Sequence, residues 1–152
     1  MPARYDDWLR QAKRDLSHAR RSLEDGEYEW ASFAAQQSAE KAVKALFLRL
    51  NRSAWGHSVS ALLQQLPAPW QADENLVDAG KELDKHYILP RYPNSYPQGA
   101  PYEFYTRGEA ERAIGHTTAI LAFCERLLAE AGRDPGGTEG SGDAPGGAAS
   151  GD

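Results

Sequence analysis

Three polar side chains of one predicted helix have the types and the spacing to bind a phosphate. Gln37, Lys41 and Lys44 lie at i, i+4 and i+7 of segment 27–50, so they project from one helix face. A phosphate on that face would meet two cationic donors and one amide. Alternatively, Glu40 pairs with Lys44 at the same helical spacing, and the stripe is ordinary solvated surface.

A second group combines an arginine with tyrosines. Arg91 precedes Tyr92 and follows Tyr87 by four residues, and a basic residue flanked by aromatic rings suits a phosphate that carries a stacked base. The alternative is a proline-stiffened loop whose tyrosines pack on the protein. If this loop folds back over segment 27–50, we expect Arg91, Lys41 and Lys44 to line one phosphate-binding cleft.

A third candidate is the pair Arg52 and His57, which are five positions apart with four residues between them. Arginine can grip a phosphate in a bidentate manner, and histidine titrates near neutral pH and can transfer protons. The pair could therefore cleave RNA without a metal. The simpler interpretation is that His57 orients a turn and Ser58 caps the helix that follows.

The remaining reactive residue types predict no metal site and no cofactor. His86 and His116 lack a second ligand at a convincing metal spacing. Cys124 lies in an apolar helical stripe and is expected to be buried. The sequence also contains no P-loop and no glycine-rich dinucleotide motif.

Two long helices should position the first group of residues. Segment 27–50 has no interior Gly or Pro, and apolar residues on several of its sides make it the central helix of the fold. The helix before it has one apolar sector and ends at Asp25-Gly26. That sector contains Tyr5, Trp8, Leu9, Ala12, Leu16, Ala19 and Leu23.

Three further helices are predicted from their end signals. A short helix near 58–66 is ended by Pro67 and Pro69. Asp73 can cap a fourth helix, and Thr106 with Glu109 forms a capping box for the last one. We therefore expect an all-α protein, a single up-and-down bundle of about five helices, with an ordered proline- and tyrosine-rich loop at 88–105.

The chain divides into a helical domain at 1–132 and a tail at 133–152. The tail consists mainly of Gly, Ala, Asp, Ser and Pro, so it cannot bury enough surface to offset the entropy of ordering. We expect it to be disordered and dispensable for stability. Its Arg133 stands against four acidic residues and gives the tail −3 of the net charge of −5, which leaves the domain nearly neutral.

Composition narrows the classes of protein that are expected. Charged residues make up 26% and hydrophobic residues 41%, as in soluble globular proteins. No apolar run approaches the roughly 20 residues of a membrane span. A single cysteine cannot form an intramolecular disulfide, and the N-terminus does not resemble a signal peptide, so we expect a cytoplasmic protein.

The order of these segments resembles the HEPN family, the higher-eukaryote and prokaryote nucleotide-binding domains. Trp8–Leu16 followed by Ala34–Leu46 is similar to the paired opening helices of that family. His57-Ser58, Leu83–Tyr87 and Arg91-Tyr92-Pro93 follow in the family's order, and the resemblance covers about residues 5–130.

The resemblance implies a non-catalytic module that binds the phosphate of a nucleotide or RNA. Family members of this kind often act beside a minimal nucleotidyltransferase, in toxin–antitoxin or stress systems, and many are homodimers. The spacing of Arg52 and His57 resembles the Arg-x4-His pattern of the family's ribonucleases. The alternatives are therefore a metal-independent endoribonuclease that uses these two residues across a homodimer, and a structural interaction domain.

Overall fold

The computed structural model describes residues 4–133 and contains five α-helices. These are α1 (Arg4–Glu24), α2 (Tyr28–Arg49), α3 (Val59–Gln64), α4 (Glu74–Asp84) and α5 (Arg107–Arg133). Two 3-10 helices, η1 (Pro93–Ser95) and η2 (Pro101–Glu103), lie between α4 and α5, and residues 4–133 contain no strand. The predicted all-α class is confirmed. Residue 133, expected in the tail, is the last residue of α5, and 134–152 lie outside the described residues.

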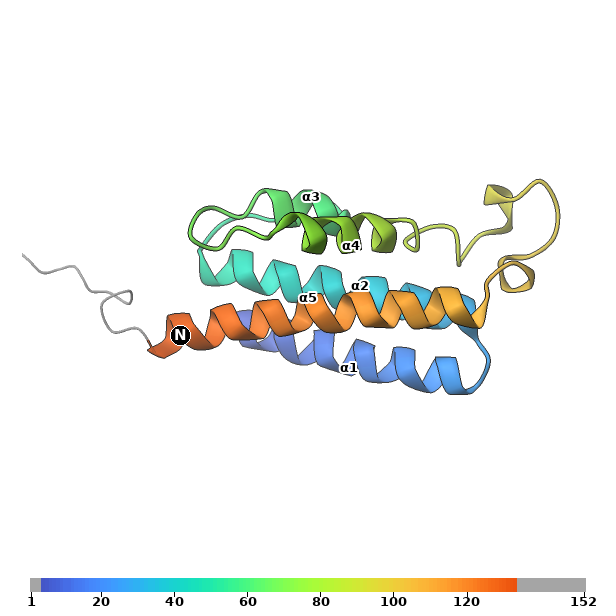
Figure 1. Cartoon of the computed structure of the whole chain (residues 1–152), viewed down its shortest axis with the longest axis horizontal. Coiled ribbons are helices and arrows are strands. Elements are labelled where there is room, and N and C mark those ends of the chain that lie inside the picture. The colour runs from blue at the N-terminus through green and yellow to red at the C-terminus, as the bar shows by residue number, and fades with distance from the viewer. Residues whose placement is uncertain (1–3, 134–152) are drawn as a thin grey trace, which may run out of the picture.

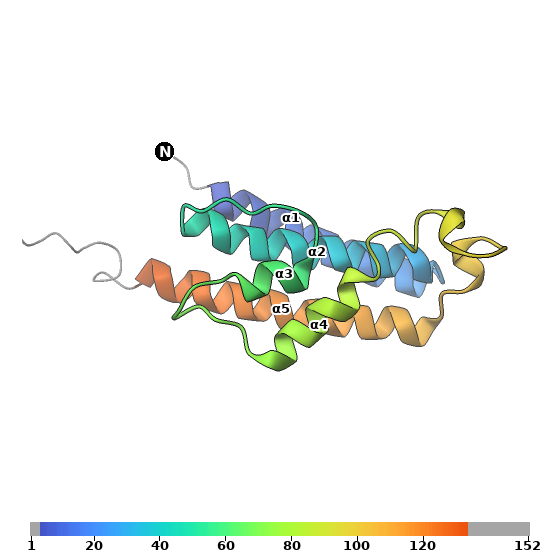
Figure 2. The same ribbon diagram turned by 90° about the horizontal axis from the view of Figure 1, so that it is seen from above.

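The three long helices lie side by side, and the two short helices pack over α2 and α5. Helix α1 runs antiparallel to α2, and α5 packs against both (Figure 1). The connection after α2 turns back along that helix and leads into a hairpin of α3 and α4 (Figure 2). Helix α3 contacts α2, and α4 contacts both α2 and α5. Helix α2 is therefore central, as its apolar residues on several sides predicted.

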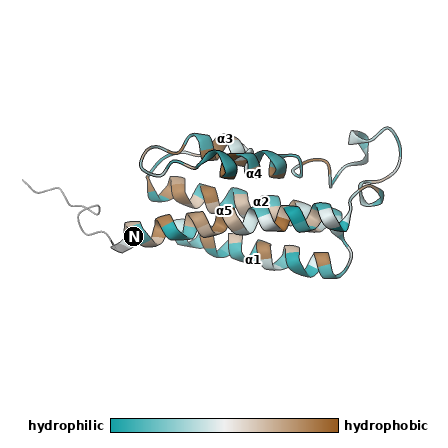
Figure 3. Cartoon of the chain, in the orientation of Figure 1, coloured by the Kyte–Doolittle hydropathy of each residue, from teal (hydrophilic) through white to brown (hydrophobic). Residues whose placement is uncertain are grey.

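The core is built around the small residues of α2. Ala35, Ala39 and Ala42 are fully buried, which allows neighbouring helices to approach closely, and the strongly hydrophobic ribbon segments lie largely on α2 and α5 (Figure 3). Two buried hydroxyl groups join these helices to their neighbours. Ser38 Oγ donates to the Ala12 carbonyl at 2.6 Å, and Thr117 Oγ1 donates to the Ala35 carbonyl at 2.7 Å. Both hydroxyls are thus satisfied without water.

Side chains cap the helices largely as the sequence indicated. Asp73 accepts a hydrogen bond from the Leu76 amide at 2.8 Å, Ser58 accepts one from Ala61, and Thr106 accepts one from Glu109. The long second and short third helices are each shorter than predicted at both ends. Helix ends are set by individual hydrogen bonds, which apolar periodicity does not specify.

The end of α4 is fastened to the start of α3 by one carboxylate. Asp84 accepts hydrogen bonds from the Val59 amide at 2.6 Å, from Ser58 Oγ at 2.8 Å and from Ser60 Oγ at 2.5 Å. A Cβ on Gly80 would lie 3.0 Å from the Ser60 amide nitrogen, so the two helices are also in close backbone contact. Their relative position is consequently well defined.

The proline-rich loop between α4 and α5 is ordered, as predicted. Pro93 and Pro101 each begin a 3-10 helix, which suits the fixed φ of proline at a first helical position. The rings of Tyr96 and Phe104 stack 4.9 Å apart. The loop forms a projection at one end of the bundle (Figure 1).

Candidate functional site

One face of α2 is left partly open between α1 and the connections on either side of the α3–α4 hairpin. Trp30 at one end of this face is 45% exposed and Leu48 at the other end is 40% exposed. Three adjoining hollows lie along it. Together they are lined by residues of α1, residues of α2 and the segment 52–55.

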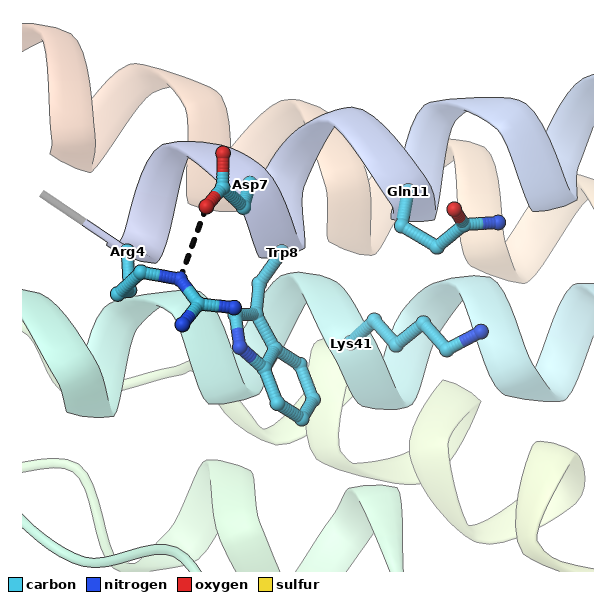
Figure 4. A pocket seen from close by; sticks show the side chains of 5 residues that line it. All are labelled: Arg4, Asp7, Trp8, Gln11 and Lys41. Carbon is cyan, nitrogen blue, oxygen red and sulfur yellow. Dashed lines mark hydrogen bonds and ion pairs between the residues drawn. The ribbon is translucent and has the colours of Figure 1, made fainter. Parts of the chain in front are cut away.

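The first hollow, termed the Arg4 hollow, lies between α1 and α2 and has a volume of about 260 Å³. Arg4, Asp7, Trp8 and Gln11 reach it from α1, and Lys41 reaches it from α2 (Figure 4). Arg4 donates to Asp7 at 2.9 Å, so its charge is already compensated.

Two further hollows extend this surface in both directions. The Trp30 hollow, of about 270 Å³, shares Lys41 with the Arg4 hollow, and the Trp55 hollow, of about 260 Å³, shares Trp8 with it. The Trp30 hollow is lined by Asp15, His18, Trp30, Phe33, Ala34, Gln37 and Lys41. The Trp55 hollow is lined by Trp8, Lys44, Phe47, Leu48, Arg52, Ser53, Ala54 and Trp55.

The predicted stripe of Gln37, Lys41 and Lys44 is engaged within the protein. Lys41 Nζ lies 2.6 Å from an Asp15 carboxylate oxygen, and Lys44 Nζ lies 3.0 Å from Glu40. Gln37 donates to the side chain of Gln36 at 2.8 Å. A phosphate at this stripe would have to compete with both carboxylates. The two lysines also line different hollows, Lys41 the Arg4 and Trp30 hollows and Lys44 the Trp55 hollow.

Glu40 is the centre of a polar network that the sequence indicated only as a partner of Lys44. Glu40 is only 5% exposed. Its carboxylate also accepts a hydrogen bond from Gln36 Nε2 at 3.1 Å and lies 2.9 Å from His57 Nδ1. Burial alone would raise the pKa of Glu40, but the hydrogen bonds from His57, Lys44 and Gln36 outweigh it and lower that pKa. Glu40 is therefore an anion near neutral pH.

The anion at Glu40 fixes the orientation of His57. Because a carboxylate can only accept hydrogen bonds, the hydrogen between the two groups lies on His57 Nδ1. The other ring nitrogen, Nε2, takes no part in this contact. The His57 side chain is 53% exposed, and Gln36 Nε2 donates to its backbone carbonyl at 3.0 Å. A half-exposed imidazole held by a buried carboxylate can exchange a proton with a bound ligand.

Arg91, Tyr87 and Tyr92 come together with His57, which the sequence placed in a separate group. The guanidinium carbon of Arg91 lies 4.5 Å from the ring centre of Phe33, 4.7 Å from that of Tyr87 and 5.2 Å from that of Tyr92. Arg91 Nε donates to the Tyr87 carbonyl at 2.7 Å. The rings of His57 and Tyr87 stack 4.4 Å apart at 16°. These five residues are termed the Arg91 cluster.

Arg52 lies on the same connection as His57 but in different surroundings. Its backbone amide donates to the Phe47 carbonyl at 2.9 Å, which closes the C-terminal end of α2 after Asn51, whose φ is +61°. Its side chain lines the Trp55 hollow with Lys44. The predicted catalytic pair is therefore divided, because Arg52 lines the Trp55 hollow and His57 belongs to the Arg91 cluster. Glu40 connects the two groups, since its carboxylate contacts both Lys44 of the hollow and His57.

Two further reactive side chains, His86 and Cys124, are buried in the fold. His86 is buried, its Nδ1 lies 2.8 Å from the Tyr105 hydroxyl, and burial lowers its pKa to about 4. Burial likewise raises the pKa of the Cys124 thiol. Over residues 4–133, no group of three or more His, Cys, Asp and Glu side chains is arranged to hold a metal ion. None of the helices in that range is long and apolar enough to cross a membrane.

A known family model matches most of the chain. The HEPN domain model matches residues 5–127. A Methanocaldococcus jannaschii protein named "Putative toxin MJ1304" is 26% identical over 132 residues, which cover 81% of this chain and 87% of that protein.

Solved structures of similar proteins have the same fold. TT1696 from Thermus thermophilus has a TM-score of 0.80 and 50% identity, over 82% of this chain and 98% of that protein. ST0689, an archaeal HEPN homologue, has a TM-score of 0.70 and 41% identity, over 84% and 99%. The HEPN domain protein tm0613 from Thermotoga maritima has a TM-score of 0.66 and 44% identity, over 81% and 98%.

Proposed function

We propose that this chain, which belongs to the HEPN domain family, is a module that binds the phosphate of a nucleotide or RNA in a toxin–antitoxin or stress system. The name of the Methanocaldococcus jannaschii relative supports the toxin–antitoxin setting. The family resemblance supports a minimal nucleotidyltransferase as a partner protein. The binding residues in this proposal are those of the Arg91 cluster.

The observation that carries the proposal is the packing of Arg91. Three aromatic rings hold its guanidinium, while its hydrogen bond to the Tyr87 carbonyl uses only Nε. Among the ion pairs of residues 4–133, none involves Arg91. Stacking positions the guanidinium without neutralising it, which leaves its other two nitrogens for a bidentate contact with phosphate.

The neighbouring rings suit the base of the same ligand. Tyr92 is 48% exposed, and Trp30 packs edge-on against Phe33 at 6.1 Å. Exposed aromatic faces next to an arginine can stack a base whose phosphate the arginine holds. His57, which stacks on Tyr87, can accept a further hydrogen bond at Nε2.

A homodimer is a further part of the proposal. Helices α1, α3, α4 and α5 cover most of α2 within one chain, but Trp30 and Leu48 on its open face are 45% and 40% exposed. Further exposed apolar side chains lie in the loop before α5, where Ile88 is 44% exposed and Phe104 is 48% exposed. A second copy could cover them.

Metal-independent cleavage of RNA is a second candidate, favoured by one observation. His57 is oriented by the buried carboxylate of Glu40, as a general base requires, and its Nε2 is not used by that contact. Arg52 would hold the scissile phosphate, in the same subunit or across a homodimer.

A titration of adenosine monophosphate and a short single-stranded RNA tests both candidates. Arg91→Gln should weaken binding of each ligand by about 10-fold or more, because a charge-assisted hydrogen bond is lost. Arg126→Gln is the matched control, since Arg126 also stacks on a ring, 5.7 Å from that of Phe123 on α5, and it should bind as the parent does.

The same samples distinguish the candidates. RNA cleaved in the presence of a chelator by the parent, but not by His57→Ala, would establish the ribonuclease. Intact RNA with nucleotide binding supports the non-catalytic module. If the parent binds neither ligand, the proposal fails and a structural interaction domain is the remaining interpretation.

A further inference from the structure

We infer that Trp55 and Arg52 form a second base-binding subsite, so that the ligand is a single-stranded oligonucleotide rather than a mononucleotide. This inference rests on the proposed function, because it places the first nucleotide at the Arg91 cluster. Trp55 is the most exposed of the large hydrophobic residues in 4–133, at 83%.

The backbone around Trp55 is held in place on both sides. The Arg52 amide donates to the Phe47 carbonyl at 2.9 Å, and the His57 carbonyl accepts from Gln36 at 3.0 Å. Gly56, directly after Trp55, has a φ of +85°, which glycine adopts without strain. The connection therefore presents the indole to solvent at a defined position next to α2.

The hollow beside Trp55 combines apolar walls with positive charge. Its volume is about 260 Å³, and Trp8, Phe47 and Leu48 contribute to its walls. That volume lies below the roughly 300–1,000 Å³ of sites for drug-sized ligands, and it suits a single base. None of the described residues that line the hollow is acidic.

Arg52 supplies the charge that would meet a phosphate here. Lys44 also lines the hollow, but it is paired with Glu40 at 3.0 Å. Arg52 takes part in none of the ion pairs among residues 4–133. An exposed indole next to an arginine is the combination with which proteins bind unpaired bases, whereas a partner protein would need a larger apolar surface.

The two subsites adjoin, and their number determines the kind of ligand. Lys44 of the Trp55 hollow and His57 of the Arg91 cluster both contact the Glu40 carboxylate, at 3.0 Å and 2.9 Å. A mononucleotide has a single base and cannot fill both subsites, and paired bases of a duplex cannot stack on protein rings. A short single strand passing His57 can occupy both subsites.

The test compares adenosine monophosphate, a single-stranded tetranucleotide and the same tetranucleotide sequence within a duplex. Trp55→Ala should weaken tetranucleotide binding by roughly 5- to 150-fold, the effect of losing one base stack, and leave monophosphate binding unchanged. Trp55→Phe should restore most of the affinity. Tyr102→Ala is the control, because Tyr102 is another exposed aromatic, 67% exposed, on η2.

The outcomes separate this inference from the proposed function. Tetranucleotide binding by Trp55→Ala equal to that of the parent would overturn the second subsite, and so would a parent that binds the tetranucleotide no better than the monophosphate. A halved sedimentation mass for Trp55→Ala would assign this surface to a second copy of the chain instead. A parent that binds no nucleotide at all would overturn both.

Discussion

Two pairs of cations flank the open face of α2, and they are held in different ways. Lys41 and Lys44 project from the helix, and each lies against a carboxylate, of Asp15 and Glu40 respectively. Arg52 and Arg91 lie in connections. Arg91 is packed against rings, and Arg52 lines a hollow. The helix cations therefore stabilise the bundle, while the arginines are the cations available to a ligand.

The difference follows from the element that carries each side chain, a central helix for the lysines and a connection for the arginines. A lysine on a central helix is close to the carboxylates of its own helix and of its neighbour, and an ion pair reduces the cost of its partial burial. An arginine in a loop can lie flat on aromatic rings and keep its charge. Charge spacing along a helix thus does not reveal which of its cations are already paired with a carboxylate.

The largest expected effect is on the free energy of unfolding when a paired lysine loses its carboxylate. Glu40→Ala should lower the free energy of unfolding by about 2–4 kcal/mol, because the Lys44 side chain, only 14% exposed, is left without its anion. Arg52→Gln should change it by less than about 0.5 kcal/mol. Urea unfolding followed by circular dichroism measures both. Equal losses of stability in the two variants would contradict the distinction between cations that stabilise the bundle and cations that are available to a ligand.

A second prediction uses pH to isolate the same carboxylate. The pKa of Glu40 is lowered from 4.5, so its stabilising effect is complete above that pH and is lost as the pH falls through the lower folded-state value. The difference in Tm between the parent and Glu40→Gln should therefore be constant above about pH 5 and shrink below about pH 4.5.

His86 does not disturb that comparison. Its pKa is lowered from 6.5 to about 4, so it destabilises both proteins alike as the pH falls across that interval, and its effect cancels in the difference. A Tm difference that stays constant through the acid range would contradict the role assigned to the Glu40 anion.

The smallest expected effect is on the salt dependence of RNA binding. Arg91→Gln should reduce the slope of log affinity against log salt by about 0.7, the value for one phosphate contact with a single strand. Lys41→Met should leave the slope nearly unchanged, because the Lys41 charge is already paired with Asp15 at 2.6 Å. An equal reduction in the two variants would show that phosphate displaces Asp15, and would restore the helix stripe as a binding surface.

Local signals in the sequence were sufficient for most of the fold. The cap at Asp73, the cap at Thr106 and the prolines that end the third helix all act within a few residues of their own position. The contacts of Asp84 with Ser58 were not predictable in this way, because they join residues that are 26 positions apart. Such contacts depend on how helices are placed in space.

The candidate site was predicted in residue type more than in arrangement. Arg91, Tyr87 and Tyr92 were selected together because they are neighbours in the chain. The proximity of His57 to Tyr87 and the contact of Phe33 with Arg91 depend on packing between distant segments. The exposure of Trp55 is not predictable from neighbouring residues, because it depends on how the connection after α2 is held against that helix.

The carboxylate of Asp84 has a consequence for motion. It ties the residue before α3 to the end of α4, and these ends lead directly to His57 on one side and to Tyr87 and Arg91 on the other. The hairpin can therefore open as one cooperative unit, with a free energy below that of global unfolding. Such an opening would withdraw the other four residues of the Arg91 cluster from Phe33 on α2 at once. A ligand bound there stabilises the closed state alone, so the rate at which the hairpin opens sets an upper limit on any exchange of ligand that requires the cluster to separate.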